Sequence, residues 1–397
     1  MTQRPHPSTV AARQGVDTDK AHGAVMPPIY LSSNFSFDGL DGKRPYDYTR
    51  SGNPTRDVLA DTLCELEGGA GCVVTATGMA AVDLSLSLLE PGDLLVAPHD
   101  CYGGTHRLLS ARARKGHFEV AFVDQGDAEA LDEALALKPK LVLIETPSNP
   151  LMRVVDVADI CARARAAGAR TVVDNTFLSP ALQKPLALGA DFVVHSTTKY
   201  INGHSDVVGG ALVSADAEDH TQIAWWANCL GLIGSPFDAY LTLRGVRTLF
   251  ARIERQQQTA GDLAEWLSGQ AGVRVVHYPG LKSHPTHAIA ARQQAGFGAM
   301  LSLELEGGID GVRAFVDGLN TFTLAESLGG VESLIAHPAL MTHAGMAPEA
   351  RRTAGITDGL IRLSIGLEHV EDLRADLASG LASLAARAPA NRTTEAA

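Results

Sequence analysis

Short apolar runs alternate with helix-forming stretches across the middle of the chain, and this alternation constrains the fold more than any other feature. The runs are rich in β-branched residues and are expected to be strands: Cys72–Ala76, Leu94–Ala97, Val120–Val123, Leu141–Glu145, Thr171–Asp174, Phe192–His195 and Val207–Val213. Helical stretches lie between most of them, for example Met79–Leu89, Thr105–Lys115, Ala128–Leu137 and Val157–Ala167. Such alternation predicts an α/β fold with a mostly parallel sheet covered by helices on both faces. Ligands of such sheets bind beyond the carboxyl ends of the strands, so the residues there are the first candidates for chemistry.

The segments on either side of this region differ from it. Residues 1 to about 60 are rich in Pro, Gly, Ser, Asn and Tyr and predict an irregular arm, with a helix starting near Asn53-Pro54-Thr55. An irregular segment of this length is unusual in a compact domain, and we expect it to be functional or to pack on a partner chain. Residues 236–268 predict one long helix that leads into a smaller α+β domain. The predicted division is therefore an arm at 1–60, a larger domain at 61–255 and a C-terminal domain at 256–397.

Composition excludes several classes of function. With 33 Lys and Arg against 45 Asp and Glu, the net charge is −12, which disfavours binding to nucleic acid or to an anionic membrane. No apolar run approaches the ~20 residues of a membrane span, and the first residues lack a signal-like apolar core. The five cysteines are odd in number and lack a C-x-x-C spacing, so free thiols in the cytoplasm are expected. His284-Pro-Thr-His287 lacks a third ligand, and no metal site is predicted.

The strongest local motif runs from Asp191 to Asp206. Within it, Lys199 follows a buried strand and precedes a turn that contains glycine. Partial desolvation there favours the neutral amine, which is the nucleophile of Schiff-base chemistry. Ser196 and Thr198 supply hydroxyl groups beside the lysine that suit a phosphate. A single lysine at a strand end is more often a surface residue, so this interpretation depends on the segments that follow.

Two further strand ends carry suitable groups. Asp174 ends a predicted strand, where a carboxylate can hold the protonated ring nitrogen of pyridoxal phosphate and keep the ring an electron sink. Taken alone, Asp174 is equally compatible with a helix cap or a ribose ligand. Gly78 opens a helix after another strand, where free N–H groups can bind a phosphate, although any tight strand–helix turn looks the same. No G-x-G-x-x-G motif follows a strand, which disfavours a dinucleotide site.

Other residues gain meaning only in combination. Tyr102 follows a predicted strand, and its ring is suited to stacking on a flat cofactor or to packing in a core. Arg362 interrupts an apolar stretch, where a charged residue usually faces water but an arginine is also suited to clamping a carboxylate. Asn149 lies in a turn after a strand, and Ser327 lies in a Gly-containing segment.

Together these segments resemble the family of pyridoxal-phosphate enzymes of cysteine and methionine metabolism, from about residue 8 to 387. The resemblance is carried by Tyr48–Thr55, Asp174–Phe177, Asp191–Ser205 and Ala325–Ser333. It implies a fold-type-I transferase with a seven-stranded sheet, assembled as a homotetramer of two catalytic dimers. It also implies that the arm reaches into the active site of a neighbouring subunit.

The resemblance assigns a role to each candidate. Lys199 would be the Schiff-base lysine and proton shuttle, Asp174 the partner of the pyridine nitrogen, and Tyr102 the residue that stacks on the ring. The phosphate would be held by Gly78, Met79, Ser196 and Thr198, joined by Tyr48 and Arg50 from a second subunit. The α-carboxylate of the substrate would be held by Asn149, Ser327 and Arg362.

Further likeness lies at Val96–Gly104, Phe122–Asp127, Ala224–Asn228 and Met341–Ala350, which resemble the members of the family that join cysteine to an activated homoserine. The implied reaction is γ-replacement on O-succinyl-L-homoserine, or another O-acylhomoserine, by L-cysteine to give L-cystathionine, as in methionine biosynthesis. Charge matching makes Arg107 and Arg50 candidates for the succinyl carboxylate and Glu326 a candidate for the amino group of cysteine. Tyr102 is a candidate for assisting proton transfer or thiol activation.

Several alternatives share these residues. A γ-lyase or an acylhomoserine sulfhydrylase of the same family would use the same set. A regulator that uses the fold as a ligand sensor is disfavoured by the complete set of Lys199, Asp174, Tyr102 and Arg362, and a nucleotide-dependent oxidoreductase by the missing glycine motif.

Overall fold

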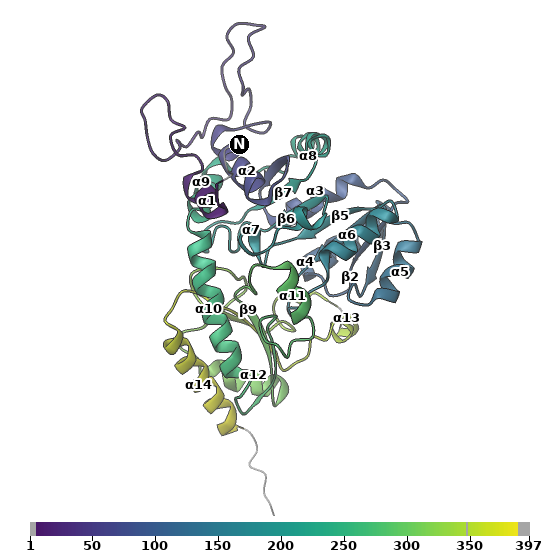
Figure 1. Cartoon of the computed structure of the whole chain (residues 1–397), viewed down its shortest axis with the longest axis vertical. Coiled ribbons are helices and arrows are strands. Elements are labelled where there is room, and N and C mark those ends of the chain that lie inside the picture. Colours follow the sequence, from purple (N-terminus) through teal and green to yellow (C-terminus); the bar gives the residue numbers. More distant parts are fainter. Residues whose placement is uncertain (1–4, 347, 388–397) are drawn as a thin grey trace, which may run out of the picture.

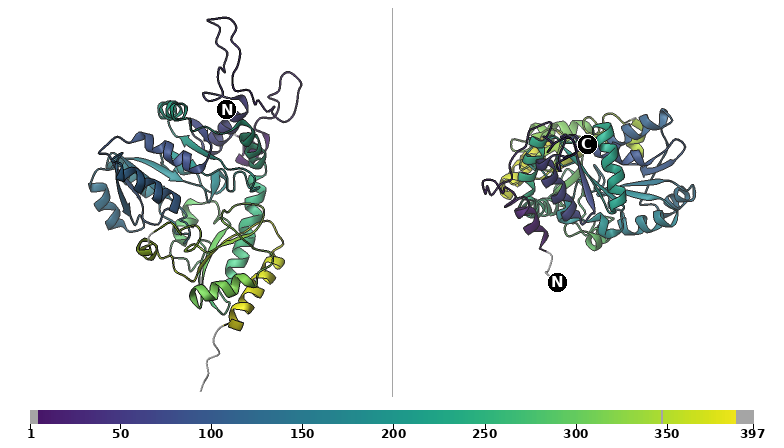
Figure 2. Two further views of the ribbon diagram at one scale, coloured as in Figure 1. Left: turned by 180° about the vertical axis from the view of Figure 1, so that it is seen from behind. Right: turned by 90° about the horizontal axis from the view of Figure 1, so that it is seen from above.

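The computed structural model describes residues 5–346 and 348–387, and they form two lobes with an arm that projects from one end (Figures 1 and 2). We call the lobe around strands β1 to β7 the large lobe and the lobe around strands β8 to β12 the small lobe. The first four residues of the predicted arm and the last ten of the predicted C-terminal domain lie outside the described residues.

The large lobe is built on a seven-stranded sheet with the order β1-β7-β6-β5-β4-β2-β3. Its strands are β1 Gly71–Thr75, β2 Leu94–Pro98, β3 Glu119–Val123, β4 Leu141–Glu145, β5 Arg170–Asp174, β6 Phe192–His195 and β7 Gly210–Ser214. Only β7 runs antiparallel to its neighbours β1 and β6, and the other pairs are parallel. The predicted mostly parallel α/β fold is confirmed, and each strand lies within three residues of its predicted bounds.

Both faces of this sheet are covered, because both sets of alternating side chains are apolar. Leu95 packs into the cluster that contains residues of α3, α4 and α8, whereas the next residue, Val96, packs against α5 and α6 on the opposite face. Helices α2 and α9 cover the β1–β7–β6 end of that second face. The bounds are α2 Pro54–Glu67, α3 Gly78–Ser85, α4 Gly103–Arg114, α5 Ala128–Ala136, α6 Val157–Ala166, α7 Ser179–Leu182, α8 Ala217–Leu230 and α9 Pro236–Val246.

The single long helix predicted for residues 236–268 is wrong, because the structure has two helices there. Helix α9 ends at Val246, and α10 spans Leu249–Leu267. Gly245 lies so close to the backbone carbonyl of Asn202 that a Cβ atom would be 2.1 Å from its oxygen. The buried Arg252 side chain then donates to the Gly245 carbonyl at 2.9 Å and to the Tyr200 carbonyl at 2.8 Å. These hydrogen bonds give buried backbone carbonyls near the end of α9 a partner, and only the tertiary structure brings the groups together.

The small lobe contains a five-stranded sheet with the order β10-β11-β12-β9-β8, and α10 runs along it (Figure 1). Its elements are β8 Val273–His277, α11 His287–Gln293, β9 Met300–Leu305, α12 Gly308–Asp317, β10 Thr323–Leu324, β11 Leu334–Ala336, α13 Pro348–Thr353, β12 Leu360–Ser364 and α14 Val370–Arg387. Its core also takes in Leu178 and Tyr200, which follow strands of the large lobe, so the two lobes share buried surface. Residue 255, where the sequence predicts a domain boundary, lies within α10, and the division into domains stays a prediction.

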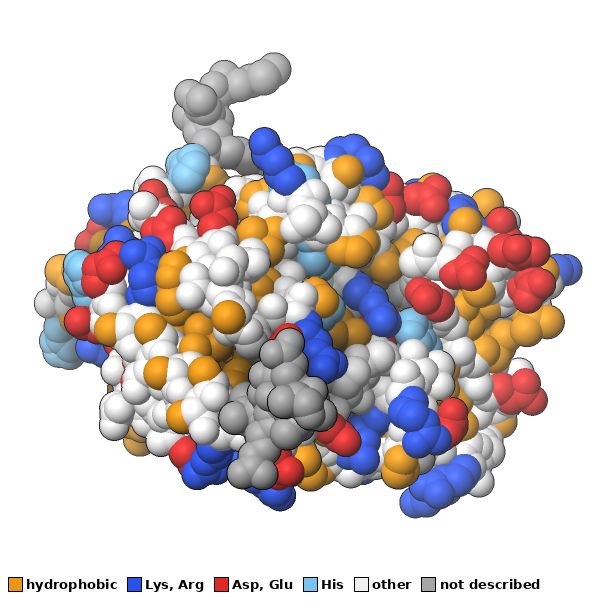
Figure 3. All heavy atoms as spheres, turned by 90° about the horizontal axis from the view of Figure 1, so that it is seen from below, with side chains coloured by type: hydrophobic (Ala, Val, Ile, Leu, Met, Phe, Trp, Pro, Cys, Tyr) orange, Lys and Arg blue, Asp and Glu red, His pale blue; other side chains and the backbone are white. Residues whose placement is uncertain are grey.

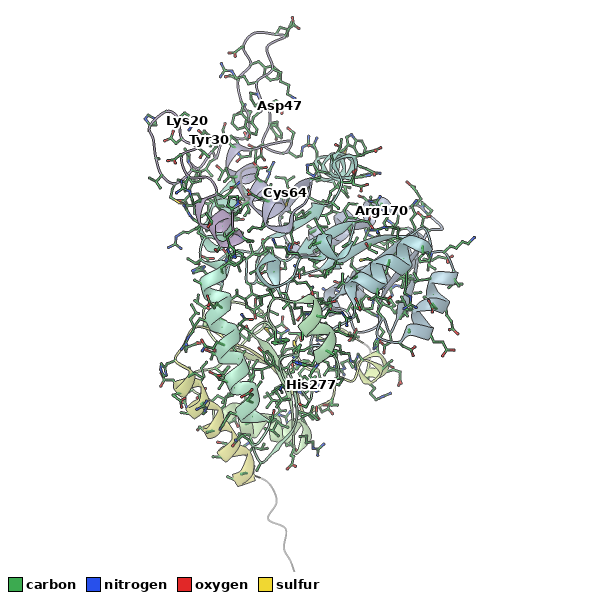
Figure 4. The ribbon with its side chains drawn as sticks, in the orientation of Figure 1. Lys20, Tyr30, Asp47, Cys64, Arg170 and His277 are labelled. Carbon is green, nitrogen blue, oxygen red and sulfur yellow. The ribbon has the colours of Figure 1, made fainter. Side chains whose placement is uncertain are left out.

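Most of the arm projects beyond the two lobes, but its first helix packs Val10 and Ala11 into a core cluster of the large lobe. Apart from this helix, α1 Pro7–Arg13, which the sequence did not predict, the arm is irregular, and one isolated bridge joins Asn34 to Tyr48. Figure 4 shows Lys20 and Asp47 in loops that project from the body, whereas His277 lies in the small lobe. Tyr30 lies at the start of α2, where its amide donates to the Thr55 Oγ1 at 2.8 Å. The arm carries large apolar side chains in the open, among them Leu40 at 96% exposure. Isolated chains rarely leave such surface uncovered, which fits an element that packs on a partner.

On the face at the free end of the small lobe, basic and acidic side chains lie interspersed (Figure 3). Within the described residues, no helix combines the length and apolar character that crossing a membrane requires.

Asn53 joins the arm to the large lobe, and this generates a prediction for stability. Its Oδ1 accepts the Thr55 and Arg56 amides at the predicted start of α2, and its Nδ2 donates to the Tyr30 carbonyl in the arm at 2.9 Å. We expect Asn53→Ala to reduce the free energy of unfolding by about 1–2 kcal/mol, because the helix cap and the arm contact are both lost. Asn53→Asp keeps the cap oxygen and is expected to lose less. Thermal and urea unfolding of the two variants measure this difference, and equal losses would contradict it.

Candidate active site

A cavity of about 380 Å³ lies where the carboxyl ends of the large-lobe strands meet the small lobe. Residues from both lobes line it: Thr77, Gly78, Met79, Val82, Tyr102, Thr105, Glu145, Pro147, Asn149, Asp174, Thr176, Phe177, Ser196, Thr198, Lys199, Val208, Glu326, Ser327, Leu328, Thr342 and Arg362. The size is typical of a site for a small ligand. Most of the predicted site residues therefore converge here from segments far apart in the sequence.

Lys199 follows β6 and projects its amine into this cavity. Its Nζ donates to the Ser327 Oγ at 2.9 Å. Burial, together with the positive charge of Arg362, lowers the pKa of Lys199 to about 8, while Glu326 acts in the opposite direction. The desolvation expected from the sequence is present, and it leaves about a tenth of this amine neutral at pH 7.

The start of α3 forms a cradle suited to a phosphate. Thr77 caps the helix by accepting the Ala80 amide, and among the described residues the amides of Gly78 and Met79 have no acceptor. A Cβ atom on Gly78 would lie 2.7 Å from the Ser196 Cβ, so only glycine permits this close approach. Free amides at a helix N-terminus beside the cavity-lining hydroxyl residues Ser196 and Thr198 match the needs of a phosphate dianion.

Asp174 ends β5 at the floor of the cavity. Its Oδ1 accepts the Thr176 amide at 3.0 Å. Burial raises the pKa of Asp174, whereas the hydrogen bonds from Thr176 and the charge of His195 oppose the rise. A protonated ring nitrogen placed against this carboxylate would favour its ionised form further.

Arg362 lies in the middle of β12 and is only 2% exposed. Its guanidinium donates to the Asn149 Oδ1 and to the Ser327 carbonyl, each at 2.9 Å, and its Nε has no partner among the described residues. Burial lowers the pKa of Arg362 to about 10, so it stays charged at neutral pH. The three residues predicted to hold a carboxylate therefore form one cluster, with Ser327 in a left-handed backbone conformation at φ +94°.

The remaining predicted residues divide into two groups. Tyr102, at 40% exposure, and Glu326 line the cavity. Arg107, Tyr48 and Arg50 are not among its lining residues, although Arg107 lies on α4 next to the cavity segment. In this chain the guanidinium of Arg50 instead lies 5.9 Å from the centre of the Tyr48 ring and donates to the Asn228 carbonyl. Tyr48 and Arg50, which the family resemblance assigns to the site of a second subunit, do not line the cavity of their own chain.

Six polar or aromatic residues of the cavity wall are not among the predicted site residues, and two of them, Thr77 and Thr105, lie at the starts of α3 and α4. Thr176 and Phe177 follow Asp174 directly, Thr342 comes from the segment after β11, and Glu145 ends β4. Glu145 carries the same signal that singled out Asp174, a carboxylate at the carboxyl end of a buried strand. No pattern in the sequence marks Thr342, because only the packing of the small lobe brings it to the cavity.

The residues present fit pyridoxal phosphate: unpaired amides for its phosphate, a carboxylate for its ring nitrogen and a desolvated lysine amine for its aldehyde. The fold and this donor set define a pyridoxal-phosphate-dependent enzyme. Residues 8–382 match the family model described as Cys/Met metabolism PLP-dependent enzyme. The chain belongs to this family, as its sequence motifs predict, and pyridoxal phosphate is its cofactor.

Individual relatives are similar along nearly their whole length. Cystathionine γ-synthase of Escherichia coli K12 is 59% identical over 374 residues, which cover 94% of this chain and 97% of that protein. The crystal structure of cystathionine γ-synthase from Xanthomonas oryzae pv. oryzae in complex with cystathionine has a TM-score of 0.96 and 65% identity, covering 97% of this chain and all of that one. Cystathionine γ-lyase from Lactobacillus plantarum, complexed with L-serine, has a TM-score of 0.93 at 39% identity, covering 96% and 100%.

The charges around Lys199 generate a prediction about its titration. In the apoprotein, we expect the reactivity of Lys199 toward an amine-selective acylating reagent to rise through a midpoint near pH 8. Arg362→Met removes a positive neighbour and is expected to raise the pKa of Lys199, whereas Glu326→Gln removes a negative neighbour and is expected to lower it. Quantitative peptide mapping across pH measures these midpoints. Identical midpoints in all three proteins would show that these charges do not act on Lys199.

Proposed function

We propose that this protein is a cystathionine γ-synthase, which replaces the acyl group of O-succinyl-L-homoserine, or another O-acylhomoserine, with L-cysteine. The bond between the cysteine sulfur and the substrate Cγ forms, the bond between Cγ and the acyl oxygen breaks, and the carboxylate leaves while the thiol loses its proton. The observation that carries the proposal is the single cavity that joins Lys199, Asp174 and the Arg362 cluster, in a chain 59–65% identical to cystathionine γ-synthases.

Bound pyridoxal phosphate supplies an electron sink that stabilises negative charge at the substrate's α and β carbons. We assign Lys199 Nζ as the attachment point of the cofactor and as the group that removes and returns protons at those carbons. An amine with a pKa of about 8 is suited to both directions of transfer, because neither protonation state is strongly disfavoured near neutral pH. The Ser327 hydroxyl, which accepts from Nζ, is suited to orienting the amine.

We assign the substrate's α-carboxylate to Arg362 with Asn149 and Ser327. The Arg362 guanidinium is already oriented by Asn149 and by the Ser327 carbonyl, so little rotamer freedom is lost when a carboxylate binds. Gly78, Met79, Ser196 and Thr198 are assigned to the cofactor phosphate, Asp174 to the ring nitrogen and Tyr102 to the ring face. Tyr102 is also our candidate for assisting proton transfer or thiol activation. Glu326 is proposed to bind the amino group of cysteine, and Arg107 the distal carboxylate of the succinyl group.

The first prediction from this function concerns the products. With O-succinylhomoserine and cysteine, we expect cystathionine to exceed 2-oxobutyrate and ammonia, as measured by mass spectrometry and an ammonia assay. Lys199→Ala is expected to reduce the rate by about 1000-fold, because among the described residues no other amine lines the cavity. The exposed Lys115→Ala serves as control. Dominant 2-oxobutyrate would assign a γ-lyase instead, and homocysteine formed from sulfide as the preferred thiol would assign a sulfhydrylase.

The assembly is also part of the proposal. We propose a homotetramer of two catalytic dimers, in which the arm delivers Tyr48 and Arg50 to the phosphate end of a neighbouring site. The exposed apolar arm supports this, as does the absence of Tyr48 and Arg50 from the cavity of their own chain. The same view divides the chain into the arm at 1–60 and the domains at 61–255 and 256–397. We also propose a cytoplasmic location, where its five free cysteines would stay reduced.

Mixing of subunits tests the role of the arm. Lys199→Ala and Arg50→Ala chains are each expected to be nearly inactive alone. After unfolding and refolding together in equal amounts, about one quarter of the wild-type activity should return, since half of the dimers are mixed and each mixed dimer has one intact site. No recovery in verified mixed dimers would contradict the assignment of Arg50 to the neighbouring site.

A further inference from the structure

Glu145 lies at the floor of the cavity, and the proposed reaction gives it no role. It ends β4, and in the sheet register its direct partner on β5 is Asp174. Its Oε2 accepts the backbone N–H of Tyr102 at 2.8 Å. Glu145 therefore joins the residue assigned to the cofactor's ring face to the strand end that carries the residue assigned to its ring nitrogen.

The Tyr102 carbonyl accepts the His106 amide of α4 at 3.0 Å, and the Tyr102 amide donates to Glu145. Tyr102 is the residue before α4, and its side chain makes no capping hydrogen bond. Its ring is partly exposed toward the cavity. The hydrogen bond to Glu145 connects the start of α4 to the floor of the site.

Two carboxylates on adjacent parallel strands lie only about 5 Å apart at the backbone, and this pair is desolvated. Burial, followed by the charge of Asp174, raises the pKa of Glu145 well above its usual value, although backbone hydrogen bonds from Tyr102 and Asn149 oppose the rise. Asp174 has stronger support for its charge, because it accepts hydrogen bonds from Thr176 and lies near His195. Burial and the charge of Asp174 favour the neutral form of Glu145, whereas the hydrogen bonds from Thr176 favour the ionised form of Asp174.

The charged groups that act on the pKa of Glu145 are both carboxylates, Asp174 and Asp100. Asp100 and Cys101, from the segment after β2, lie near Glu145, and Asp100 adds negative charge. A second cavity of about 630 Å³ reaches Glu145 from the opposite side and is lined by Arg153, His277 and His284. Arg153 already donates to Asp100 at 3.1 Å. Burial lowers the pKa of both histidines to about 4, so they are neutral there.

We propose that Glu145 is a positioning residue, which as a neutral carboxylic acid holds Tyr102 against the cofactor site without placing a second negative charge beside Asp174. This inference rests on the proposed function for the identity of the reaction, but not for the binding of the cofactor. Its chemical consequence is specific: a neutral amide of the same shape should replace the side chain, whereas an apolar group should not.

The experiment compares Glu145→Gln with Glu145→Ala, and Glu119→Ala, an exposed carboxylate at the start of β3, is the control. The affinity of each apoprotein for pyridoxal phosphate is measured by titration, followed through quenching of protein fluorescence. Thermal unfolding of each apoprotein is measured alongside, and kcat/KM for γ-replacement is measured with saturating cofactor. Should Glu145→Ala fail to fold, Glu145→Met, which fills a similar volume without a polar group, takes its place.

We expect Glu145→Gln and Glu119→Ala to bind the cofactor within about threefold of wild type, and Glu145→Ala or Glu145→Met to bind it about tenfold more weakly or worse, with a similar fall in kcat/KM. Rescue by the amide separates a neutral hydrogen-bonding role from a charged one. The proposal is overturned if Glu145→Gln is as impaired as the apolar variant, or if the apolar variant binds as wild type does. Because cofactor affinity is measured without substrate, a wild-type protein that lacks γ-replacement activity refutes the proposed function and leaves this test of Glu145 intact.

Discussion

The desolvation of one lysine amine at the carboxyl edge of a parallel sheet is the constraint on which the rest of this site depends. Lys199 is buried beside Arg362, so two positive groups share a region of low dielectric constant. That arrangement lowers the pKa of Lys199, and it is tolerated because each cation has its own partner: Ser327 for the amine, and Asn149 with the Ser327 carbonyl for the guanidinium. The same burial makes an amine that can both accept and return a proton.

The two lobes contribute different parts of this arrangement. The large lobe supplies the parallel strand ends, where Asp174, Lys199 and the start of α3 converge for a topological reason. The small lobe supplies Arg362 from the middle of β12, and with it the recognition of a carboxylate. Tyr200, next to Lys199, packs into the core of the small lobe, so that the position of the lysine and the seating of that lobe depend on each other. A site divided in this way requires both lobes to be folded before it exists.

Within the residues that the structure describes, the phosphate cradle of this chain lacks a positively charged side chain of its own. Among the described residues, the only cations that line the cavity are Lys199 and Arg362, and both are engaged away from the phosphate cradle. At the phosphate cradle, the described part of this chain therefore offers a phosphate dianion only backbone amides and hydroxyl groups. The exposed arm, with Tyr48 and Arg50 stacked near each other at its base, is the element that we propose completes the neighbouring subunit's site. Assembly and catalysis would then depend on the same contacts.

Much of this was determined by local sequence. Because consecutive residues of each strand are apolar, the strands predict a sheet that is covered on both faces. Short-range signals such as Asn53-Pro54 and Thr77-Gly78 mark helix starts that the structure reproduces. The family motifs contain Lys199 and Asp174 because the residues of each motif are neighbours in sequence, and Arg362 stood out as a charged residue inside an apolar stretch. Other features were decided only by the tertiary structure. The helix predicted for 236–268 is interrupted at Arg247 and Thr248, between α9 and α10. Glu145 gains its importance from Asp174 on one neighbouring strand and from Tyr102, which follows the other neighbouring strand. Protonation and backbone contact depend on which charges and carbonyls lie within a few ångströms, and a sequence pattern carries no such distances until the chain has folded.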